Sequence, residues 1–391
     1  MSRVTKVEPF ILTIDRDEPY LGALRKGEEK NEKGYFVRKG NKTVYLDKDR
    51  TVLVRVETES GTVGWGETYG LVAPRATTEI ISDLLADFVI GCDPSEASAV
   101  HDDLYNLMRV RGYSGGFYLD ALAAVDIALW DAAGREAGKS IAELLGGRLH
   151  NTVPCYVSGL PKPTLEERVA FALEWQARGY NSFKFAATVA DDGNVKEMSE
   201  LRTALGADAK ISCDMHWAHT PEGAITEIQA MEPYDLWFAE APIVTEDIQG
   251  LSKVAASTHT PTAVGEEWRT LFDANLRFNA NAVQIVQPEM GHTGITEFVR
   301  IAREAHSRGI PLLPHATIGS GIFLAASLQA GLAMEGLMGH EFQHSIFNRN
   351  TGLITEGLEC SEGAYLVVDS PGIGIKPTEE LISQLEPANA C

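Results

Sequence analysis

Residues 210–240 read KISCDMHWAHTPEGAITEIQAMEPYDLWFAE, and this stretch decides the fold. An apolar run at residues 210–213 ends at Asp214, and a second apolar run at residues 236–239 ends at Glu240. Short apolar runs of this kind predict buried strands, whereas the amphipathic spacing at residues 222–231 predicts a helix between them. The stretch is therefore one strand–helix–strand unit, which favours a parallel sheet.

The same rhythm continues on both sides of this unit. Further strands are expected at residues 153–157, 182–186, 262–265, 283–286, 311–314 and 337–342, and further helices at residues 165–177, 195–205 and 297–307. Seven or eight such units in about 200 residues favour a closed α/β barrel of the TIM type. An open doubly wound sheet is the alternative, but its usual G-x-G-x-x-G motif is missing after the first strand.

The first ~130 residues follow another order, with strands before helices, which predicts an α+β domain. Strands are expected at residues 4–14, 51–57 and 63–67, and helices at residues 77–108 and 119–137. Asp93 and Pro94 should break the first helical region, and Gly138 should end the second. We expect an α+β domain at residues 1–130, a barrel at residues 131–355 and a C-terminal segment at residues 356–391, which from residues 365–371 onward returns to β character and pairs with the first domain.

The composition is that of a folded globular protein, with 44% hydrophobic and 23% charged residues in a chain of 391. No apolar run reaches the ~20 residues of a membrane-spanning helix, and residues 1–30 show no secretory signal. The net charge of −21 argues against binding to nucleic acid or to an anionic membrane. Five scattered cysteines without a C-x-x-C motif predict free thiols and a cytoplasmic location.

A basic loop interrupts this acidic chain. Residues 16–50 contain ten Lys/Arg and seven Asp/Glu, a net charge of +3. Such a loop is most often a solvated surface segment, but it can also attract a small anion. Because mobile loops commonly carry substrate selection, we expect the loop to contact substrate through Tyr20, Lys26 and Tyr35.

Three consecutive predicted strands end in a carboxylate. Asp214, Glu240 and Glu266 are spaced by 26 residues each, so they should lie at neighbouring positions on the carboxyl-terminal rim of a barrel. A single carboxylate at a strand end is usually only solvated, whereas three with one period are a more specific pattern. Hard oxygen ligands from adjacent strands are typical of a Mg²⁺ site.

Proton carriers flank this triad in the predicted barrel. Lys184 ends the second strand, His315 ends the seventh, and Glu289 on the sixth strand is placed to orient His315. Mg²⁺ on a substrate carboxylate stabilises an enediolate, so an α-proton becomes removable by a base on either face. We expect burial and the metal ion to lower the pKa of Lys184 so that it acts as the leading base.

This set of residues resembles the enolase superfamily and, within it, the mandelate racemase subgroup. The matching positions are Lys184, Asp214, Glu240 and Glu266 together with the pair Glu289–His315, and AVDIALWDAAGREAG near residues 124–138 resembles the junction between the two domains. The resemblance implies a (β/α)7β barrel with an N-terminal capping domain and Mg²⁺ on the three carboxylates. Two positions depart from the subgroup: Ser182 stands where Lys-x-Lys has its first lysine, and Glu289 where an Asp is common.

Asp214-Met215-His216 is similar to the Asp-x-His motif of acid-sugar dehydratases in this superfamily, in which the histidine protonates the departing hydroxyl. On a continued strand, Asp214 and His216 would share a face about 7 Å apart. The resemblance therefore implies a Mg²⁺-dependent dehydratase of an aldonate or aldarate. A lactone cycloisomerase or a racemase is the alternative within the fold, and a non-catalytic binding barrel is a more distant one.

Two further expectations concern binding partners. Ser182 and Glu341, which the eighth predicted strand carries, are expected to contact the acid-sugar substrate. A homo-oligomer is expected by analogy with relatives, which usually assemble, and Trp65 with the apolar faces of the hairpin at residues 51–67 offers a surface to bury.

Overall fold

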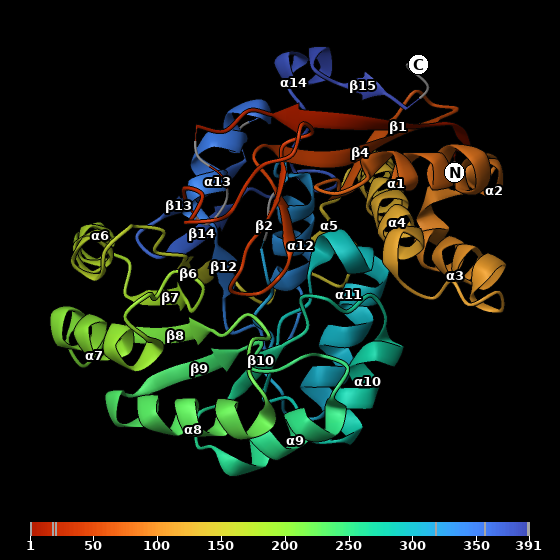
Figure 1. Cartoon of the computed structure of the whole chain (residues 1–391). Coiled ribbons are helices and arrows are strands. Elements are labelled where there is room, and N and C mark those ends of the chain that lie inside the picture. The colour runs from red at the N-terminus through yellow and green to blue at the C-terminus, as the bar shows by residue number, and fades with distance from the viewer. Residues whose placement is uncertain (1, 18, 20–21, 317–318, 356, 389–391) are drawn as a thin grey trace.

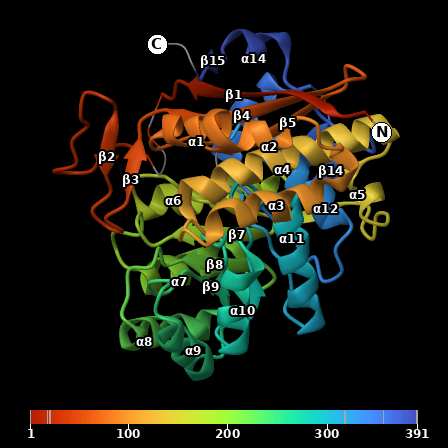
Figure 2. The ribbon, with the colours of Figure 1, turned by 90° about the vertical axis from the view of Figure 1, so that its right-hand side faces the viewer.

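The computed structural model describes residues 2–17, 19, 22–316, 319–355 and 357–388. Figures 1 and 2 show two parts, an N-terminal α+β domain and a barrel that it covers at one end. Within the described residues no helix combines the length and apolar character needed to cross a membrane.

The N-terminal domain is built on an antiparallel sheet of β1 (Val4–Ile14), β4 (Asp49–Thr58) and β5 (Val63–Tyr69). These confirm the three expected strands, two of them slightly longer. Helix α4 (Gly116–Ala137) packs against β5 so closely that only glycine fits at two positions. A Cβ added to Gly64 would lie 2.2 Å from the carbonyl oxygen of Ala128, and one on Gly66 would lie 1.8 Å from that of Ala124.

The other helices of this domain lie in the expected helical region, which also contains a π-helical turn. They are α1 (Pro74–Ile80), a π-helical turn (Ile81–Leu85), α2 (Ala86–Val89), a 3-10 turn (Pro94–Glu96) and α3 (Ala97–Arg109). The predicted break is confirmed, because the side chain of Asp93 accepts a hydrogen bond from the Ser95 amide at 2.9 Å. Helix α4 ends as predicted at Gly138, which has a left-handed φ of +64°.

The basic loop between β1 and β4 carries a short hairpin of β2 (Tyr35–Val37) and β3 (Val44–Leu46). Figure 2 shows this hairpin reaching beyond the capping domain beside the barrel. Its tip contacts the loop that follows the second barrel strand, since a Cβ on Gly40 would lie 3.3 Å from Cγ2 of Thr188. An ion pair between Arg25 and Asp191 at 2.8 Å joins the same two loops.

The barrel strands run in parallel and in chain order. They are β6 (Val153–Ser158), β7 (Ser182–Ala186), β8 (Lys210–Asp214), β9 (Leu236–Glu240), β10 (Thr262–Val264), β11 (Ile285–Val286) and β12 (His340–Phe342). Between β11 and β12 the chain completes the wall through the parallel bridges Val286↔Leu312 and Leu312↔Leu337. Since β12 pairs with β6, the sheet is closed, and the open-sheet alternative is wrong.

Helices cover the outside of this wall. They are α6 (Leu165–Ala177), α7 (Asn194–Leu205), α8 (Pro221–Met231), α9 (Ile248–Ser257), α10 (Leu271–Asn279), α11 (Met290–Ser307) and α12 (Ile322–Leu332). Side chains that alternate along the strands fill the inside, among them Tyr156, Phe238, Ala263, Ile285 and Leu313. Helix α11 begins seven residues before the expected start, with a kink at Gly294, so that Glu289 caps it.

The C-terminal segment differs in part from the expectation. A hairpin of β13 (Leu358–Ser361) and β14 (Ala364–Val367) pairs with β6 of the barrel, so Tyr365 does not return to the first domain. The return comes later, where β15 (Glu386–Pro387) pairs with β1 after the short helix α14 (Glu379–Ser383). The domain boundaries at residues 130 and 355 remain predictions.

Candidate active site

Acidic and basic side chains gather at the carboxyl-terminal rim of the barrel. Asp214 and Glu240 are direct partners in the parallel pairing of β8 with β9, so they lie at one level. Glu266 comes from beyond β10, because the residue level with Glu240 on that strand is Ala263 and the chain turns at Gly265, with φ of +135°. The equal spacing of 26 residues therefore brings the carboxylates to one rim, but not to one register.

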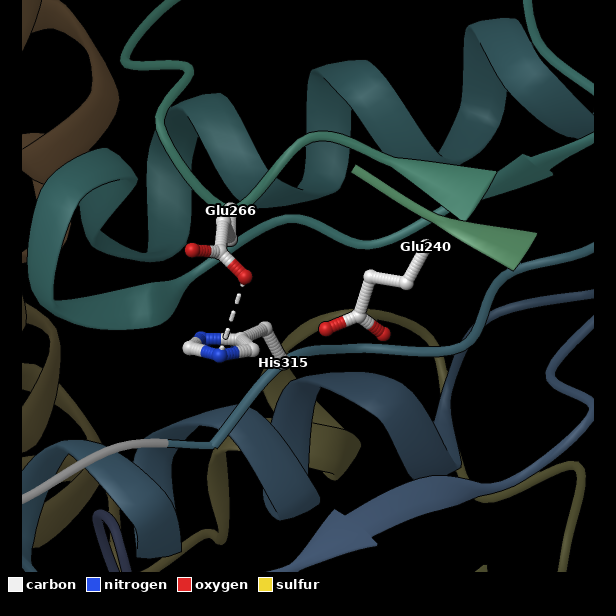
Figure 3. Close-up of side chains that lie close together, drawn as sticks. All are labelled: Glu240, Glu266 and His315. Carbon is white, nitrogen blue, oxygen red and sulfur yellow. Dashed lines mark ion pairs between the residues drawn. The ribbon is translucent and has the colours of Figure 1, made fainter. Parts of the chain in front are cut away.

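Glu240, Glu266 and His315 form the tightest cluster. One ligand atom from each lies within 4.8 Å of the other two, and Figure 3 shows the three side chains directed toward one another. Nε2 of His315 is 3.1 Å from Oε2 of Glu266. Burial raises the pKa of Glu240 to about 7 and that of Glu266 to about 8, and the charge of Asp214 adds to both effects. Glu240 is buried and Glu266 is partly buried, and carboxylates that repel one another in such a setting fit a hard divalent cation between them.

His315 is held by a second carboxylate. Its Nδ1 lies 2.8 Å from Oε2 of Glu289, and that side chain is 1% exposed. Burial alone would lower the pKa of His315, but the carboxylates of Glu266, Glu341 and Glu289 outweigh it and raise the pKa well above its usual value. The longer Glu289 thus reaches His315 in place of the common Asp.

Lys184 lies deeper in the barrel than the rim carboxylates. Ala186 is the β7 residue level with Asp214, whereas Lys184 is level with Ser212. Its ammonium pairs with Glu240 and, at 3.1 Å, with Oε1 of Glu341. Burial would lower the pKa of Lys184, as the sequence led us to expect, but these two carboxylates raise it well above the usual value.

Asp214 and His216 form a separate pair beside the cluster. Strand β8 ends at Asp214, and His216 has a left-handed φ of +50°, so the two side chains do not share one face of a continued strand, as we had expected. The ring folds back instead, with Nε2 3.0 Å from Oδ2 of Asp214. Asp214 is therefore absent from the tightest cluster of the described residues, although its charge reaches Glu240 and Glu266.

The expected substrate contacts are scattered. Glu341 lies in the centre, between Lys184 and His315, whereas Ser182 begins β7 at the opposite end of the barrel from the rim. Lys26 is exposed, and the Tyr35 hydroxyl accepts a hydrogen bond from Arg50 within the capping domain. Tyr20 lies outside the described residues.

The sequence analysis predicted no role for Gln287 and Tyr45, which lie near the site. Nε2 of Gln287 donates to Oε2 of Glu240 at 2.5 Å, and its place at the end of the sixth strand was the available signal. Burial raises the pKa of Tyr45 in the capping hairpin to about 12, and the negative charges of Asp214 and Glu266 add to the effect. The local sequence around Tyr45 gives no sign of this proximity.

Comparison with known proteins identifies the family. Residues 167–381 match the family described as enolase C-terminal domain-like, and residues 41–146 match the mandelate racemase/muconate lactonizing enzyme N-terminal domain. The chain belongs to the enolase superfamily, in the mandelate racemase/muconate lactonizing enzyme subgroup. The expected capping domain and barrel are thereby confirmed, and this enolase-superfamily chain is an enzyme, which replaces the non-catalytic alternative.

Individual relatives of this enolase-superfamily enzyme differ in activity. It is 31% identical to a D-galactarolactone cycloisomerase from Agrobacterium fabrum, over 87% of this chain and 92% of that one. It is 29% identical to a D-galactonate dehydratase from Xanthomonas euvesicatoria pv. vesicatoria, over 88% and 92%. A crystal structure of a candidate isomerase from Sinorhizobium meliloti is 59% identical, with a TM-score of 0.98 over 98% of this chain and 100% of that one.

Proposed function

We propose that the protein is a Mg²⁺-dependent dehydratase of an acid sugar, an aldonate or an aldarate. The observation that carries the proposal is a pair of carboxylate-bound imidazoles on either side of the acidic cluster. His216 follows β8 and His315 ends the seventh strand, and β9, β10 and β11 separate them around the barrel. Elimination of water needs a base for the α-proton and an acid for the leaving hydroxide, and these two groups supply both.

The metal ion is assigned to the carboxylates. Glu240 and Glu266 would hold it together with Asp214, which is level with Glu240 on the neighbouring strand. Mg²⁺ bound there would supply positive charge against the second negative charge of an enediolate. His315 is close enough to be a ligand itself, but carboxylate oxygens suit Mg²⁺ better than an imidazole does.

We assign removal of the α-proton to His315. Because Glu289 holds Nδ1, the opposite edge of the ring, Nε2, faces Glu266 and the acidic cluster where the substrate carboxylate would bind. Lys184 remains a candidate base for the other face, but it lies one layer below the rim and between two carboxylates. Its ammonium is better placed to offset their charge and to orient the substrate carboxylate.

His216 would complete the elimination. Its ring is held by Asp214 at the rim, where the β-hydroxyl of a bound 2,3-dihydroxy acid would come close. Proton transfer from the imidazole to that hydroxyl lets it leave as water, because hydroxide alone is a poor leaving group. The C–O bond breaks, the electron pair of the enediolate forms the new C=C bond, and the enol product tautomerises to a 2-keto-3-deoxy acid.

Substrate selection is assigned to the capping domain. The basic loop approaches the barrel through Gly40 and Arg25. The Arg50 guanidinium donates both to the Tyr35 hydroxyl and to the carbonyl oxygens of residues 70 and 71, so it joins the loop to the end of β5. Removal of residues 25–42 should therefore change the substrate profile and KM. An unchanged profile would place selection in the barrel loops.

A cycloisomerase is the second candidate, favoured by the relative from Agrobacterium fabrum, and the structure from Sinorhizobium meliloti supports the broader class of isomerases. The two proposals share the enolate and differ in the next step. We would incubate the enzyme with Mg²⁺ and a library of aldonates, aldarates and their lactones, and measure 2-keto acid together with deuterium uptake at the α-carbon.

Formation of a 2-keto-3-deoxy acid, lost with EDTA and restored by Mg²⁺, would support the dehydratase. His216→Asn should then lose keto acid formation while it retains α-exchange. Lactone conversion or exchange without keto acid from any substrate would replace the dehydratase by the cycloisomerase. Exchange that survives in His315→Asn but not in Lys184→Ala would move the base to Lys184.

A further inference from the structure

Two cysteines meet on the outer side of the barrel wall. Sγ of Cys155 in β6 lies 3.5 Å from Sγ of Cys360 in β13, although 205 residues separate them in the chain. Strand β13 is at the edge of its sheet, beyond β14. Figure 1 shows this C-terminal hairpin beside β6 and β12.

Several contacts hold the two sulfur atoms at this distance. The Cys155 amide donates to the carbonyl oxygen of Gly363 at 2.8 Å, which ties β6 to the hairpin turn. The Tyr180 hydroxyl donates to the carbonyl oxygen of Cys360 at 3.0 Å. The turn also rests on Gly179, where an added Cβ would lie 3.1 Å from Cα of Glu362. The contact is therefore part of the packing rather than a chance approach of two surface residues.

We propose that Cys155 and Cys360 are a redox modification site. The two residues form a disulfide with each other when a low-molecular-weight disulfide, such as oxidised glutathione, oxidises them. The thiols need to approach by about 1.5 Å to reach bonding distance, which rotation of the side chains and a small shift of an edge hairpin can provide. This inference does not depend on the proposed function.

Exposure decides the order of the two steps. Cys360 is partly exposed, whereas Cys155 is 7% exposed, so the oxidant reaches Cys360 first. The Cys360 thiolate attacks the small disulfide, forms a mixed disulfide and releases one thiol. The Cys155 thiolate then attacks the sulfur of Cys360 and releases the second thiol. Two protein thiols are oxidised, one small disulfide is reduced to two thiols, and the protein loses two protons.

The effect should be on stability rather than on catalysis. Cys155 faces the layer between the wall and its outer cover, whereas its neighbour Tyr156 points into the barrel. A bond across a loop of 205 residues restricts the unfolded chain strongly, so the oxidised protein should unfold at a temperature several degrees higher. Turnover of the oxidised and reduced forms should agree within about twofold, since within the described part of the chain the two sulfur atoms contact each other and Tyr180 rather than the site residues.

The test is oxidation of the purified full-length protein with oxidised glutathione, followed by digestion without reductant. We expect a peptide pair linked through Cys155 and Cys360, lost on addition of dithiothreitol, together with the rise in thermal midpoint. Cys360→Ser should abolish both, and Cys92→Ser, which removes another partly exposed thiol, should abolish neither.

Two results would overturn the proposal. One is a glutathione adduct that persists on Cys360 of the wild type without any linked peptide. The other is a linked peptide with an unchanged or lower thermal midpoint. If Cys155→Ser fails to fold, Cys360→Ser on the edge strand still decides the question.

Discussion

Nδ1 of His315 lies 2.8 Å from a carboxylate oxygen of Glu289, and the same two residues form a parallel β-bridge between neighbouring strands. Both the backbone and the side chains therefore fix this pair. The imidazole edge left over, Nε2, faces Glu266 at 3.1 Å and Glu341 at 3.4 Å. The pair presents one nitrogen, in one orientation, to the centre of the barrel mouth.

Glu289→Gln should lower kcat by about 10³-fold, because an amide can donate to Nδ1 and so leave the proton on Nε2, where a base is needed. The measurement is α-proton exchange in heavy water, together with product formation. Glu289→Asp is the matched control, since it keeps the charge and should retain more activity than the amide. Equal rates for Glu289→Gln and the wild type would show that this carboxylate does not orient the base.

His315→Asn separates the role of a base from that of a metal ligand. If His315 is the base, the variant should bind Mg²⁺ within about threefold of the wild-type affinity and lose α-exchange. Glu240→Gln should lose metal binding as well, because it removes one of the buried carboxylates of the cluster. Isothermal titration with Mg²⁺ decides whether His315 is a base or a metal ligand. A large loss of Mg²⁺ affinity in His315→Asn would show that the imidazole is a ligand.

Gln287→Leu should weaken Mg²⁺ binding by about 10–100-fold. Its amide donates to Oε2 of Glu240, so the leucine leaves that carboxylate free to rotate toward Lys184, with which it also pairs. Gln284→Leu is a useful control, because Gln284 bonds to Thr262 near the opposite end of the neighbouring strand. Equal metal affinities for wild type and Gln287→Leu would remove Gln287 from the site.

The sequence predicted the barrel because a buried strand appears as a short apolar run, and such runs recur at regular intervals along the chain. The expected strands at residues 153–157, 182–186 and 210–213 match β6, β7 and β8 within one residue. The seventh strand is harder, since Leu312 joins its neighbours only through isolated bridges. The family relationship that the motifs suggested is confirmed, whereas the individual catalytic roles remain predictions.

Contacts between residues far apart in the chain could not be predicted from the sequence patterns. Glu67 in β5 accepts hydrogen bonds from the amides of Ile322 and Phe323, more than 250 residues away, and so joins the capping domain to the start of α12. Nothing in the local pattern around Glu67 distinguishes it from a solvated strand-end carboxylate. The predicted fall in the pKa of Lys184 was wrong because of another long-range contact. Glu341 approaches Lys184 only when β12 pairs with β6 and closes the barrel.

Stability should decrease in acid through His344, which begins helix α13 (His344–Asn350) after the last barrel strand. The ring is packed against Phe171 and Trp175, and its Nε2 lies 3.0 Å from the carbonyl oxygen of Gly159. Burial lowers the pKa of His344 to about 4, against 6.5 when it is exposed. Between pH 4 and pH 6.5, His344 is therefore protonated in the unfolded chain and neutral in the folded chain.

Protonation of His344 therefore favours the unfolded chain. The contribution of His344 to stability is complete above pH 6.5 and is lost as the pH falls toward 4, by about 3 kcal/mol. His344→Gln keeps a donor for Gly159 but cannot titrate, so its free energy of unfolding should change less between pH 7 and pH 4. Urea unfolding across this range measures the effect, with the exposed His259→Gln as the matched control. Parallel pH profiles for wild type and His344→Gln would show that this histidine is not held neutral by the fold.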